Sequence, residues 1–201
     1  MSVRSSSDGD ENSQPSNVLL VTSTGDSCEG TACRELSERN APAQSHVILA
    51  TGLGSASERL ADWDAEVGVR PAETTVVDVA TATRSVAATA AGSEHDTWPG
   101  VTVDHVDARD LLGLSETLDR ALTRSDRPTT LCVRSVSDLL QSADLETVFK
   151  LLEALTRNVE RTGGVAHYHL NADVHDDETL DTLAVLFDAV VDVSDHGGAD
   201  H

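Results

Sequence analysis

The strongest constraint on the fold is an alternation, between residues 17 and 194, of short apolar runs with longer segments of helical period. This alternation is typical of βαβ units, in which helices cover both faces of a parallel sheet. We expect strands at Val18–Thr22, His46–Ala50, Thr75–Val79, Val101–Val106, Thr130–Arg134, Val165–Leu170 and Ala189–Val193. We expect helices at Glu29–Arg39, Ala56–Trp63, Asp110–Arg124, Asp144–Arg161 and Asp177–Phe187. The sequence therefore predicts an α/β domain of three layers, with a mostly parallel sheet flanked by helices.

The helix predicted at Asp144–Arg161 has the clearest pattern, because its apolar residues recur at intervals of three and four and form one stripe. Asp144 is a suitable cap for its first turn, and Gly163 follows its end. On the outer face, Glu146 stands four residues before Lys150, a spacing that favours an ion pair. That face is expected to be a solvated surface and not a site.

The length of 201 residues is enough for one compact domain but not for two substantial ones. Residues 1–16 and 195–201 contain almost no apolar side chains, so we expect disordered tails around a single domain at 17–194. The stretch from 80 to 100, rich in Ala, Thr and Ser, is predicted to form a helix followed by a loop.

The charge balance is strongly acidic, with 35 acidic residues against 14 basic ones and a formal net charge of −21. Lys150 is the only lysine, so arginine supplies nearly all of the positive charge. An acidic surface of this kind is typical of cytoplasmic proteins from salt-accumulating archaea, in which concentrated salt screens the repulsion. The alternative is an acidic patch for a basic partner. Binding to nucleic acid is disfavoured because no cluster of basic residues is present.

The cysteines, Cys28, Cys33 and Cys132, do not form a CxxC pair or an evenly spaced framework. We therefore expect neither a disulfide scaffold nor a zinc ribbon, and we interpret them as small buried apolar residues. No apolar run approaches the length of a signal peptide core or a membrane span. The expected location is the cytoplasm, with no contact to a membrane.

The segment between the first strand and the first helix has the setting of a phosphate-binding loop. Gly25 and Gly30 have the GxxxxG spacing of a Walker A motif. However, Thr31 stands where the phosphate-binding lysine belongs, and Ala32 where the magnesium-binding hydroxyl belongs. Backbone N–H groups at a helix start remain, and they are worth only about 0.3–1 kcal/mol for an exposed anion. The loop is therefore expected to bind a triphosphate weakly or not at all.

The order of segments from Asn17 to Val193 resembles the RecA-like ATPase core, and in particular its KaiC-type branch. The resemblance is strongest in residues 107–193, where 131–140 is similar to the Walker B strand with its following Asp-Ser-Leu stretch. Residues 186–193 are similar to the closing strand of the branch. The chain thus resembles a degenerate haloarchaeal member of unassigned function. This resemblance implies a RecA-like order of strands and assembly side by side with other copies.

The residues that carry the chemistry of that family are missing here. Arg134 stands where the Walker B aspartate belongs, so a cation occupies the place of a magnesium ligand. Thr51 and Gly52 end the second strand, where the KaiC branch has a catalytic glutamate pair, and Glu58 follows only several residues later. We expect no catalytic residue and no cofactor. An ion pair between Arg134 and a nearby carboxylate would make this remnant site structural.

The strand predicted at Val165–Leu170 places His167 and His169 on one face, and His175 follows its end. The resemblance places this strand between the phosphate-loop strand and the Walker B strand. Two imidazoles and a carboxylate can bind a transition metal. The alternative is that these histidines are hydrogen-bonded within the sheet or cap the next helix. No metal is therefore expected.

Together these observations favour a non-catalytic, RecA/KaiC-like regulatory or scaffolding domain that acts through protein–protein contacts. Its protein partner is unknown, and a homo-oligomer is compatible with the resemblance. One alternative is an ATPase with a rearranged site, in which Arg134 or the face with His167 and His169 replaces the lost groups. Another is a metal-binding sensor at His167, His169 and His175.

Overall fold

The computed structural model describes residues 2–5, 14–23, 29–52, 55–80, 100–134 and 136–193. Gly25 and Cys28, most of the predicted helix and loop at 80–100, and the predicted tail at 195–201 lie outside these ranges. Among the described residues, none of the helices combines the length and the hydropathy that a bilayer crossing requires.

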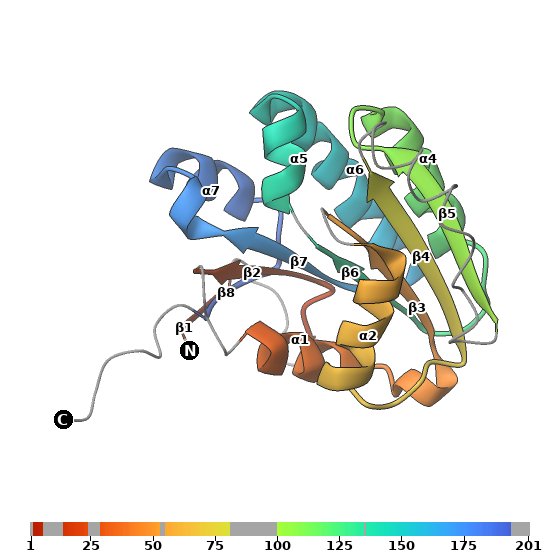
Figure 1. Ribbon diagram of the computed structural model, residues 1–201. Coiled ribbons are helices and arrows are strands. Elements are labelled where there is room, and N and C mark those ends of the chain that lie inside the picture. Colours follow the sequence, from red (N-terminus) through yellow and green to blue (C-terminus); the bar gives the residue numbers. More distant parts are fainter. Residues whose placement is uncertain are drawn as a thin grey trace.

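The fold is a three-layer α/β arrangement around one sheet (Figure 1). The strands are β1 (Ser2–Ser5), β2 (Asn17–Thr22), β3 (His46–Ala50), β4 (Glu73–Ala80), β5 (Val101–Asp107), β6 (Thr129–Val133), β7 (Val165–Asn171) and β8 (Ala189–Asp192). The helices are α1 (Glu29–Glu38), α2 (Ala56–Glu66), α4 (Leu111–Leu122), α5 (Val136–Ser142), α6 (Leu145–Thr162) and α7 (Asp177–Ala184), with short 3-10 turns η1 (Pro42–Gln44) and η3 (Ala172–Val174). The predicted fold class is confirmed.

The sheet has the order β1-β8-β2-β7-β6-β3-β4-β5. All of its pairings are parallel except that of β1 with β8. β7 lies between β2 and β6, as expected for the strand that carries His167 and His169. Because the strands are parallel, the carboxyl ends of β2, β7, β6 and β3 meet at one edge of the sheet, where ligands of open α/β sheets bind.

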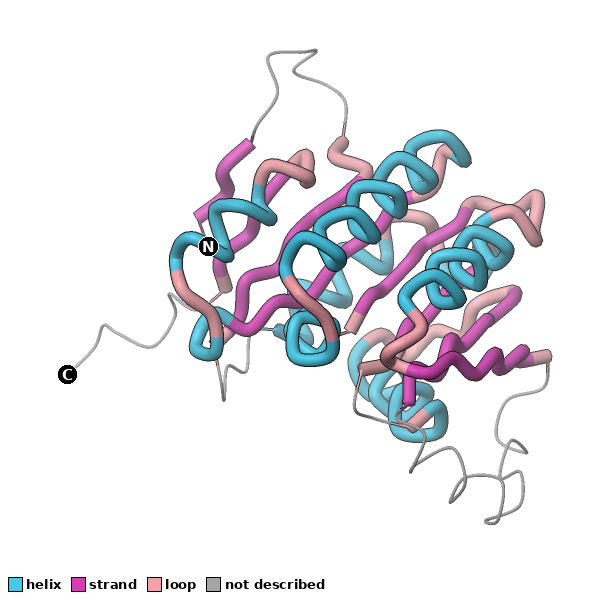
Figure 2. Tube along the Cα trace, turned by 90° about the horizontal axis from the view of Figure 1, so that it is seen from above, coloured by secondary structure: helices cyan, strands magenta, loops and turns pink. Residues whose placement is uncertain are grey.

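Two apolar layers enclose the sheet, because strand residues alternate between its faces. On one face, Leu19, Ile48 and Leu131 pack with residues of α4, α5, α6 and α7. On the other face, Val47 and Leu49 pack with α2, and Val18 and Leu20 pack with α1. Figure 2 shows helices on both sides of the strands.

Local signals in the sequence explain where several helices begin and end. Asp144 accepts a hydrogen bond from the backbone N–H of Thr147, and Gly163 closes α6 with a positive φ of 69°. Ser55 and Glu58 form a reciprocal capping box at the start of α2. Glu58, the first carboxylate after the place where the KaiC branch has its glutamate pair, thus caps the start of helix α2.

Three differences between the structure and the sequence predictions concern the sheet and the candidate site. β1 lies within the predicted disordered tail at 1–16, and its backbone extends the sheet beyond β8. The short helix α5 was not predicted, since its seven residues merge with the strand before it. Helix α2 continues past the predicted end at Trp63 to Glu66. This extra turn brings Glu66 into the candidate site.

Candidate functional site

The phosphate-loop remnant lies at the start of α1. Gly30 and Thr31 belong to its first turn, with Thr31 exposed and Ala32 buried against β2. A side chain at Gly30 would meet the side chain of Glu66, whose Cγ lies 3.5 Å from the position of a Cβ there. The remnant therefore faces a carboxylate from α2. Such a neighbour repels a phosphate group and does not attract it.

Arg134 follows β6 at the edge where the carboxyl ends of the strands meet. Its backbone N–H donates to the carbonyl oxygen of Ala50, which fixes the turn beside β3. Its Nη2 lies 2.9 Å from Oε1 and 3.2 Å from Oε2 of Glu66, and its Nη1 lies 3.9 Å from Oδ2 of Asp62. The ion pair between Arg134 and a nearby carboxylate, raised as a possibility from the sequence, is thus present.

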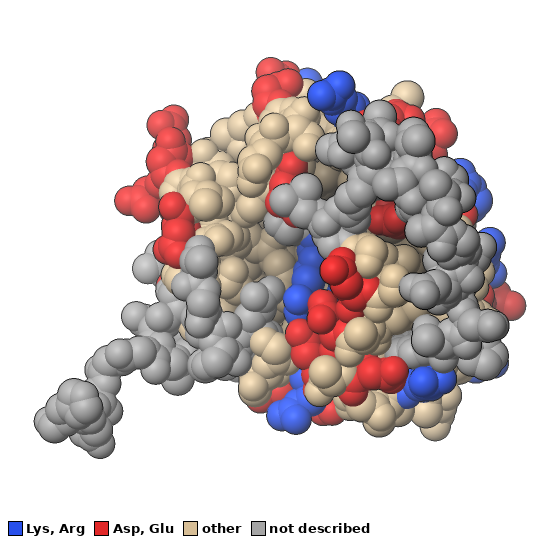
Figure 3. Space-filling model, viewed as in Figure 1, with Lys and Arg blue, Asp and Glu red and all other residues tan. Residues whose placement is uncertain are grey.

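The surface around this ion pair carries both signs of charge. In Figure 3 acidic side chains gather over α2, beside a narrow strip of basic ones. The side chains of Arg134 and Glu66 are 22% and 20% exposed, so they are largely shielded from water and salt. The charge of the arginine is therefore balanced inside the protein, and it is not presented to an anionic ligand.

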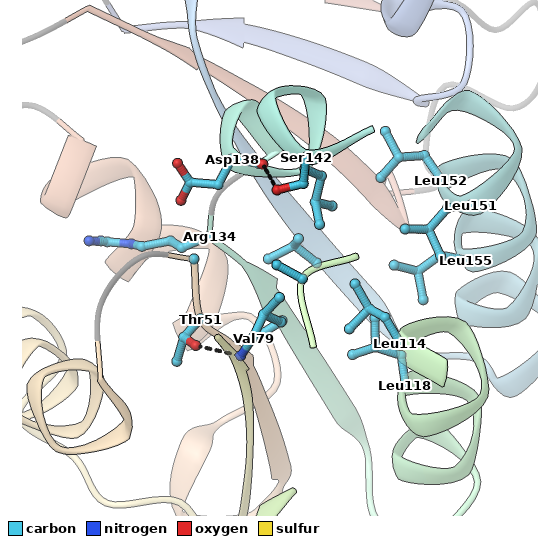
Figure 4. A pocket seen from close by; sticks show the side chains of 15 residues that line it. Thr51, Val79, Leu114, Leu118, Arg134, Asp138, Ser142, Leu151, Leu152 and Leu155 are labelled. Atoms are coloured by element: carbon cyan, nitrogen blue, oxygen red, sulfur yellow. Dashed lines mark hydrogen bonds between the residues drawn. The ribbon is translucent and has the colours of Figure 1, made fainter. Parts of the chain in front are cut away.

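A cavity opens on the other side of the sheet edge, between β6 and the helices α4, α5 and α6 (Figure 4). Leucines from α4 and α6 form its interior, while Arg134 and Asp138 point away from them. Its volume is about 40 Å³. Pockets for nucleotide-sized ligands are larger, about 300–1,000 Å³. This cavity has room for a few waters or a small apolar group.

A second group of functional side chains is buried on the face of the sheet covered by α1 and α2. It comprises Cys33 from α1, Cys132 from β6, and His167 and His169 from β7, which we call the Cys/His cluster. Its four candidate ligand atoms all lie within 4.8 Å of one another. The exposed fractions of its members are between 0% and 3%. This arrangement contains thiols, which the sequence analysis did not combine with the histidines.

The register of the sheet explains how these side chains meet. Cys132 pairs directly with His167 across β6 and β7, and His169 points to the same face two residues later. Sγ of Cys33 lies 3.2 Å from Nε2 of His167, and Sγ of Cys132 lies 3.6 Å from Nε2 of His169. The imidazole rings of the two histidines are 5.3 Å apart between centroids.

Arg59 of α2 lies beside the Cys/His cluster and was missed in the sequence analysis. Its Nη2 donates to Sγ of Cys132 at 3.3 Å and lies 4.0 Å from Sγ of Cys33. Its side chain is buried, and Nη1 lies 3.7 Å from Asp62 and 3.9 Å from Glu66. The two arginines, Arg59 and Arg134, therefore share the same carboxylates.

The environment shifts the pKa values within the cluster in opposite directions. The hydrogen bond with Cys132, together with burial, raises the pKa of the Cys33 thiol. Burial alone would raise the pKa of Cys132, but its hydrogen bond with Cys33 and the charges of His167 and Arg59 lower it well below the usual value. Burial lowers the pKa of His167. The two thiols therefore differ in acidity, and the thiol of Cys132 is the more acidic of the two.

The structure brings together two of the three histidines that the metal-sensor alternative named. His167 and His169 lie in the Cys/His cluster, whereas His175 follows η3 and is not among its members. The prediction that Cys33 and Cys132 are buried is confirmed, but their thiols also contact histidine and arginine side chains, which an apolar interpretation leaves out. The sequence did contain a signal for this group. Cys132 lies in the strand that the resemblance places beside the strand of His167 and His169, at a position whose side chain faces the same side of the sheet.

Comparison with solved structures shows the same fold in two proteins of Pyrococcus horikoshii. The protein PH0250 matches with a TM-score of 0.55 and 14% identity, over 90% of this chain and 83% of that one. The uncharacterized protein PH0321, solved in complex with an unknown peptide, matches with a TM-score of 0.56 and 14% identity, over 89% and 78%. A search of curated proteins found no match.

A family profile matches nearly the whole described domain, from the segment before β2 to the residue after β8. The match spans residues 15–193, so the chain belongs to DUF7504, a family of unknown function.

Proposed function

We propose that this chain is a non-catalytic domain of RecA/KaiC-like architecture that acts through protein–protein contacts. The observation that carries the proposal is the ion pair between Arg134 and Glu66, at 2.9 Å. It fills the place at the end of β6 where the resemblance expects a carboxylate for magnesium. A guanidinium cannot bind Mg²⁺, and a guanidinium paired with a carboxylate of the same chain does not easily exchange that carboxylate for a polyphosphate.

Two further features support the loss of nucleotide chemistry. Thr31 is an exposed residue in the first turn of α1, so no lysine is available there for the β- and γ-phosphates. The side chain of Glu66 lies against Gly30 and occupies the surroundings of the remnant loop with a carboxylate. Phosphoryl transfer depends on positive charges and positioned metal ions, and the guanidinium of Arg134 at this edge is already paired with Glu66.

The proposed partner is a protein because the charge of the chain disfavours nucleic acid. With 35 acidic and 14 basic residues, the phosphate backbone would be repelled. The PH0321 structure contains a peptide, which is compatible with peptide or protein recognition on this fold. Cys33 and Cys132 are free thiols, which is compatible with a reducing, cytoplasmic location.

The test is titration calorimetry of the full chain with ATP in multi-molar KCl, with and without magnesium. A salt-tolerant ATPase titrated in the same buffer is the positive control, and circular dichroism establishes that the sample is folded. We expect no binding up to millimolar ATP. Magnesium-dependent binding at micromolar ATP would contradict the proposal and favour an ATPase with a rearranged site, for which hydrolysis is then measured.

Light scattering on the same folded sample tests the simplest protein partner, a second copy of the chain. A mass that is a multiple of 21.2 kDa would identify homo-association. A mass of one chain at all concentrations would direct the search to a different protein.

A further inference from the structure

The Cys/His cluster has the geometry of a metal centre. In a tetrahedral zinc site, Zn–S bonds of about 2.3 Å and Zn–N bonds of about 2.0–2.1 Å place sulfur and nitrogen about 3.6 Å apart. The observed sulfur–nitrogen distances are 3.2 Å between Cys33 and His167 and 3.6 Å between Cys132 and His169. All other pairs of ligand atoms lie within 4.8 Å. Shifts of about an ångström complete the tetrahedron.

The four ligands come from rigid parts of the fold. β6 and β7 are neighbouring strands in the middle of the sheet, and they supply Cys132, His167 and His169. Helix α1, which packs on β2 and β7, supplies Cys33 from the helical layer that covers this face of the sheet. Side chains on packed strands and helices are held more precisely than side chains on loops, so little ordering is needed when an ion binds.

The charges of the site also fit a divalent cation. Two cysteine thiolates balance the two positive charges of the ion, and the two imidazoles bind as neutral ligands. The charges of Arg59 and Arg134 are balanced together by the two carboxylates of Asp62 and Glu66. The filled site would therefore bury no net charge, which avoids the main penalty for charges inside a protein.

We propose that the Cys/His cluster binds one Zn²⁺ ion. A set of two thiolates and two imidazoles in tetrahedral arrangement is typical of zinc, and four protein ligands leave no open position for a substrate. The site is therefore structural. On binding, the ion replaces the remaining thiol protons of Cys33 and Cys132, which pass to solvent, and forms two Zn–S and two Zn–N bonds.

The consequence for the fold is a link between α1 and the centre of the sheet. Cys33 is the ligand that connects the helix to β6 and β7, so zinc would fix α1 against the strands. Arg59 donates to the sulfur of Cys132 and would act as a supporting residue outside the ligand set. This inference is independent of the proposed loss of ATPase activity.

The experiment measures zinc in the full chain, purified in multi-molar KCl without a histidine tag. Elemental analysis should give about one zinc per chain, the content of a closed four-ligand site. Replacement of the zinc by Co²⁺ should produce the visible absorption bands of tetrahedral cobalt with thiolate ligands. Zinc-free folded protein with reduced thiols that takes up no Zn²⁺ or Co²⁺ would overturn the proposal. The same holds for a Cys33–Cys132 disulfide located by peptide mapping of the purified chain.

Variants assign the ligands. Cys33→Ser and His169→Ala should each reduce the zinc content of the purified chain at least about tenfold, since each removes one of four ligands. His175→Ala is the matched control, because this described residue does not belong to the cluster, and it should keep the wild-type content. Loss of zinc in the control, or full zinc content in Cys33→Ser, would overturn the assignment. If the ligand variants do not fold, the cobalt spectrum of the wild-type chain still decides.

Discussion

Arg134 donates from Nη2 to both carboxylate oxygens of Glu66, at 2.9 Å and 3.2 Å, and so ties the end of β6 to the last turn of α2. Both side chains are about four-fifths shielded from solvent. The same carboxylate lies 3.9 Å from Nη1 of Arg59, which contacts the Cys/His cluster. Glu66 therefore connects the remnant of the phosphate site with the proposed zinc site.

Glu66→Gln should destabilise the fold, because the amide leaves two shielded guanidinium groups without a full negative charge. We expect the free energy of unfolding to fall by about 1–2 kcal/mol, as for a charged hydrogen bond that is partly exposed. Chemical denaturation in multi-molar KCl measures the difference.

The control is Glu146→Gln, which removes the partner of Lys150 on the exposed face of α6. Both side chains of that pair are well exposed, at 78% and 68%, so salt screens their attraction. The free energy of unfolding should not change measurably. Equal losses in the two variants would show that the pair of Arg134 and Glu66 has no special role in the fold.

Gly30→Ala should stabilise the chain slightly. If the glycine is only a remnant of a phosphate loop, its place in α1 is better filled by alanine, which favours helices by up to about 1 kcal/mol. Its Cβ would make ordinary contacts with Glu66, at 3.5 Å or more. We expect a gain of about 0.5 kcal/mol in the free energy of unfolding.

Gly163→Ala is the matched control with the opposite sign. Gly163 has a φ of 69°, which alanine adopts only with strain, although no described residue beyond its own helix and chain neighbours lies within 4 Å of its Cβ position. The substitution should reduce stability by about 1 kcal/mol. If Gly30→Ala also lost stability, the fold would require a glycine at position 30, and the prediction would be wrong.

The sheet was predictable because its signals are local. Each strand from β2 to β8 was located within about two residues, since apolar runs bounded by polar segments mark buried parallel strands. β1 was not predicted, because four residues in a polar tail carry no such signal. The strand forms because the edge of β8 offers its backbone a hydrogen-bonding partner. Its pairing is a tertiary effect that the local sequence does not encode.

The candidate site was less predictable, because its residues come from elements distant in sequence. Arg59 and Glu66 lie seven residues apart, on one face of α2 when the helix is complete, but the predicted end at Trp63 removed the second of them. Cys33 meets His167 only because α1 packs on β7, a contact between residues 134 positions apart. Hydrophobic periodicity places such elements in layers but does not specify which polar side chains face one another.

Tyr168→Phe tests a buried hydrogen bond on the other face of the sheet. The hydroxyl of Tyr168 donates to Oδ1 of Asn17 at 3.1 Å, and Nδ2 of Asn17 donates to the carbonyl oxygen of Thr156 at 3.2 Å. Phenylalanine keeps the ring, which packs against Phe187, but leaves Oδ1 without this donor. The free energy of unfolding should fall by about 1–2 kcal/mol.

A double-mutant cycle with Asn17→Ala identifies the source of that loss. If the hydroxyl acts through Asn17, the double variant should lose less stability than the sum of the two single variants. Strict additivity would show that the two side chains do not interact.

Buried His46 should make stability depend on pH. Its imidazole is 0% exposed, Nε2 lies 2.9 Å from Oγ1 of Thr75, and Nδ1 has no hydrogen-bond partner among the described residues. Burial lowers the pKa of His46; the carboxylate of Glu73 opposes this shift, and Arg124 adds to it. The histidine is therefore neutral in the folded state at a pH where the unfolded chain begins to bind a proton.

The sign follows from proton binding. Below about pH 6.5, the ordinary pKa of histidine, the unfolded state takes up a proton that folded His46 refuses. The free energy of unfolding should then fall as the pH drops, by at most about 1.4 kcal/mol per pH unit for this one group, until the lowered pKa of the folded state is reached. Above about pH 6.5 this contribution should be constant.

His46→Gln isolates this contribution from the other titrating groups. Glutamine cannot take up a proton in this range, so the variant should have a shallower dependence of unfolding free energy on pH between about 6.5 and 5. Carboxylates and the remaining histidines contribute equally to both chains and cancel in the difference. Chemical denaturation at several pH values in multi-molar KCl gives the two curves. Parallel curves would mean that folded His46 accepts its proton as easily as the unfolded chain does.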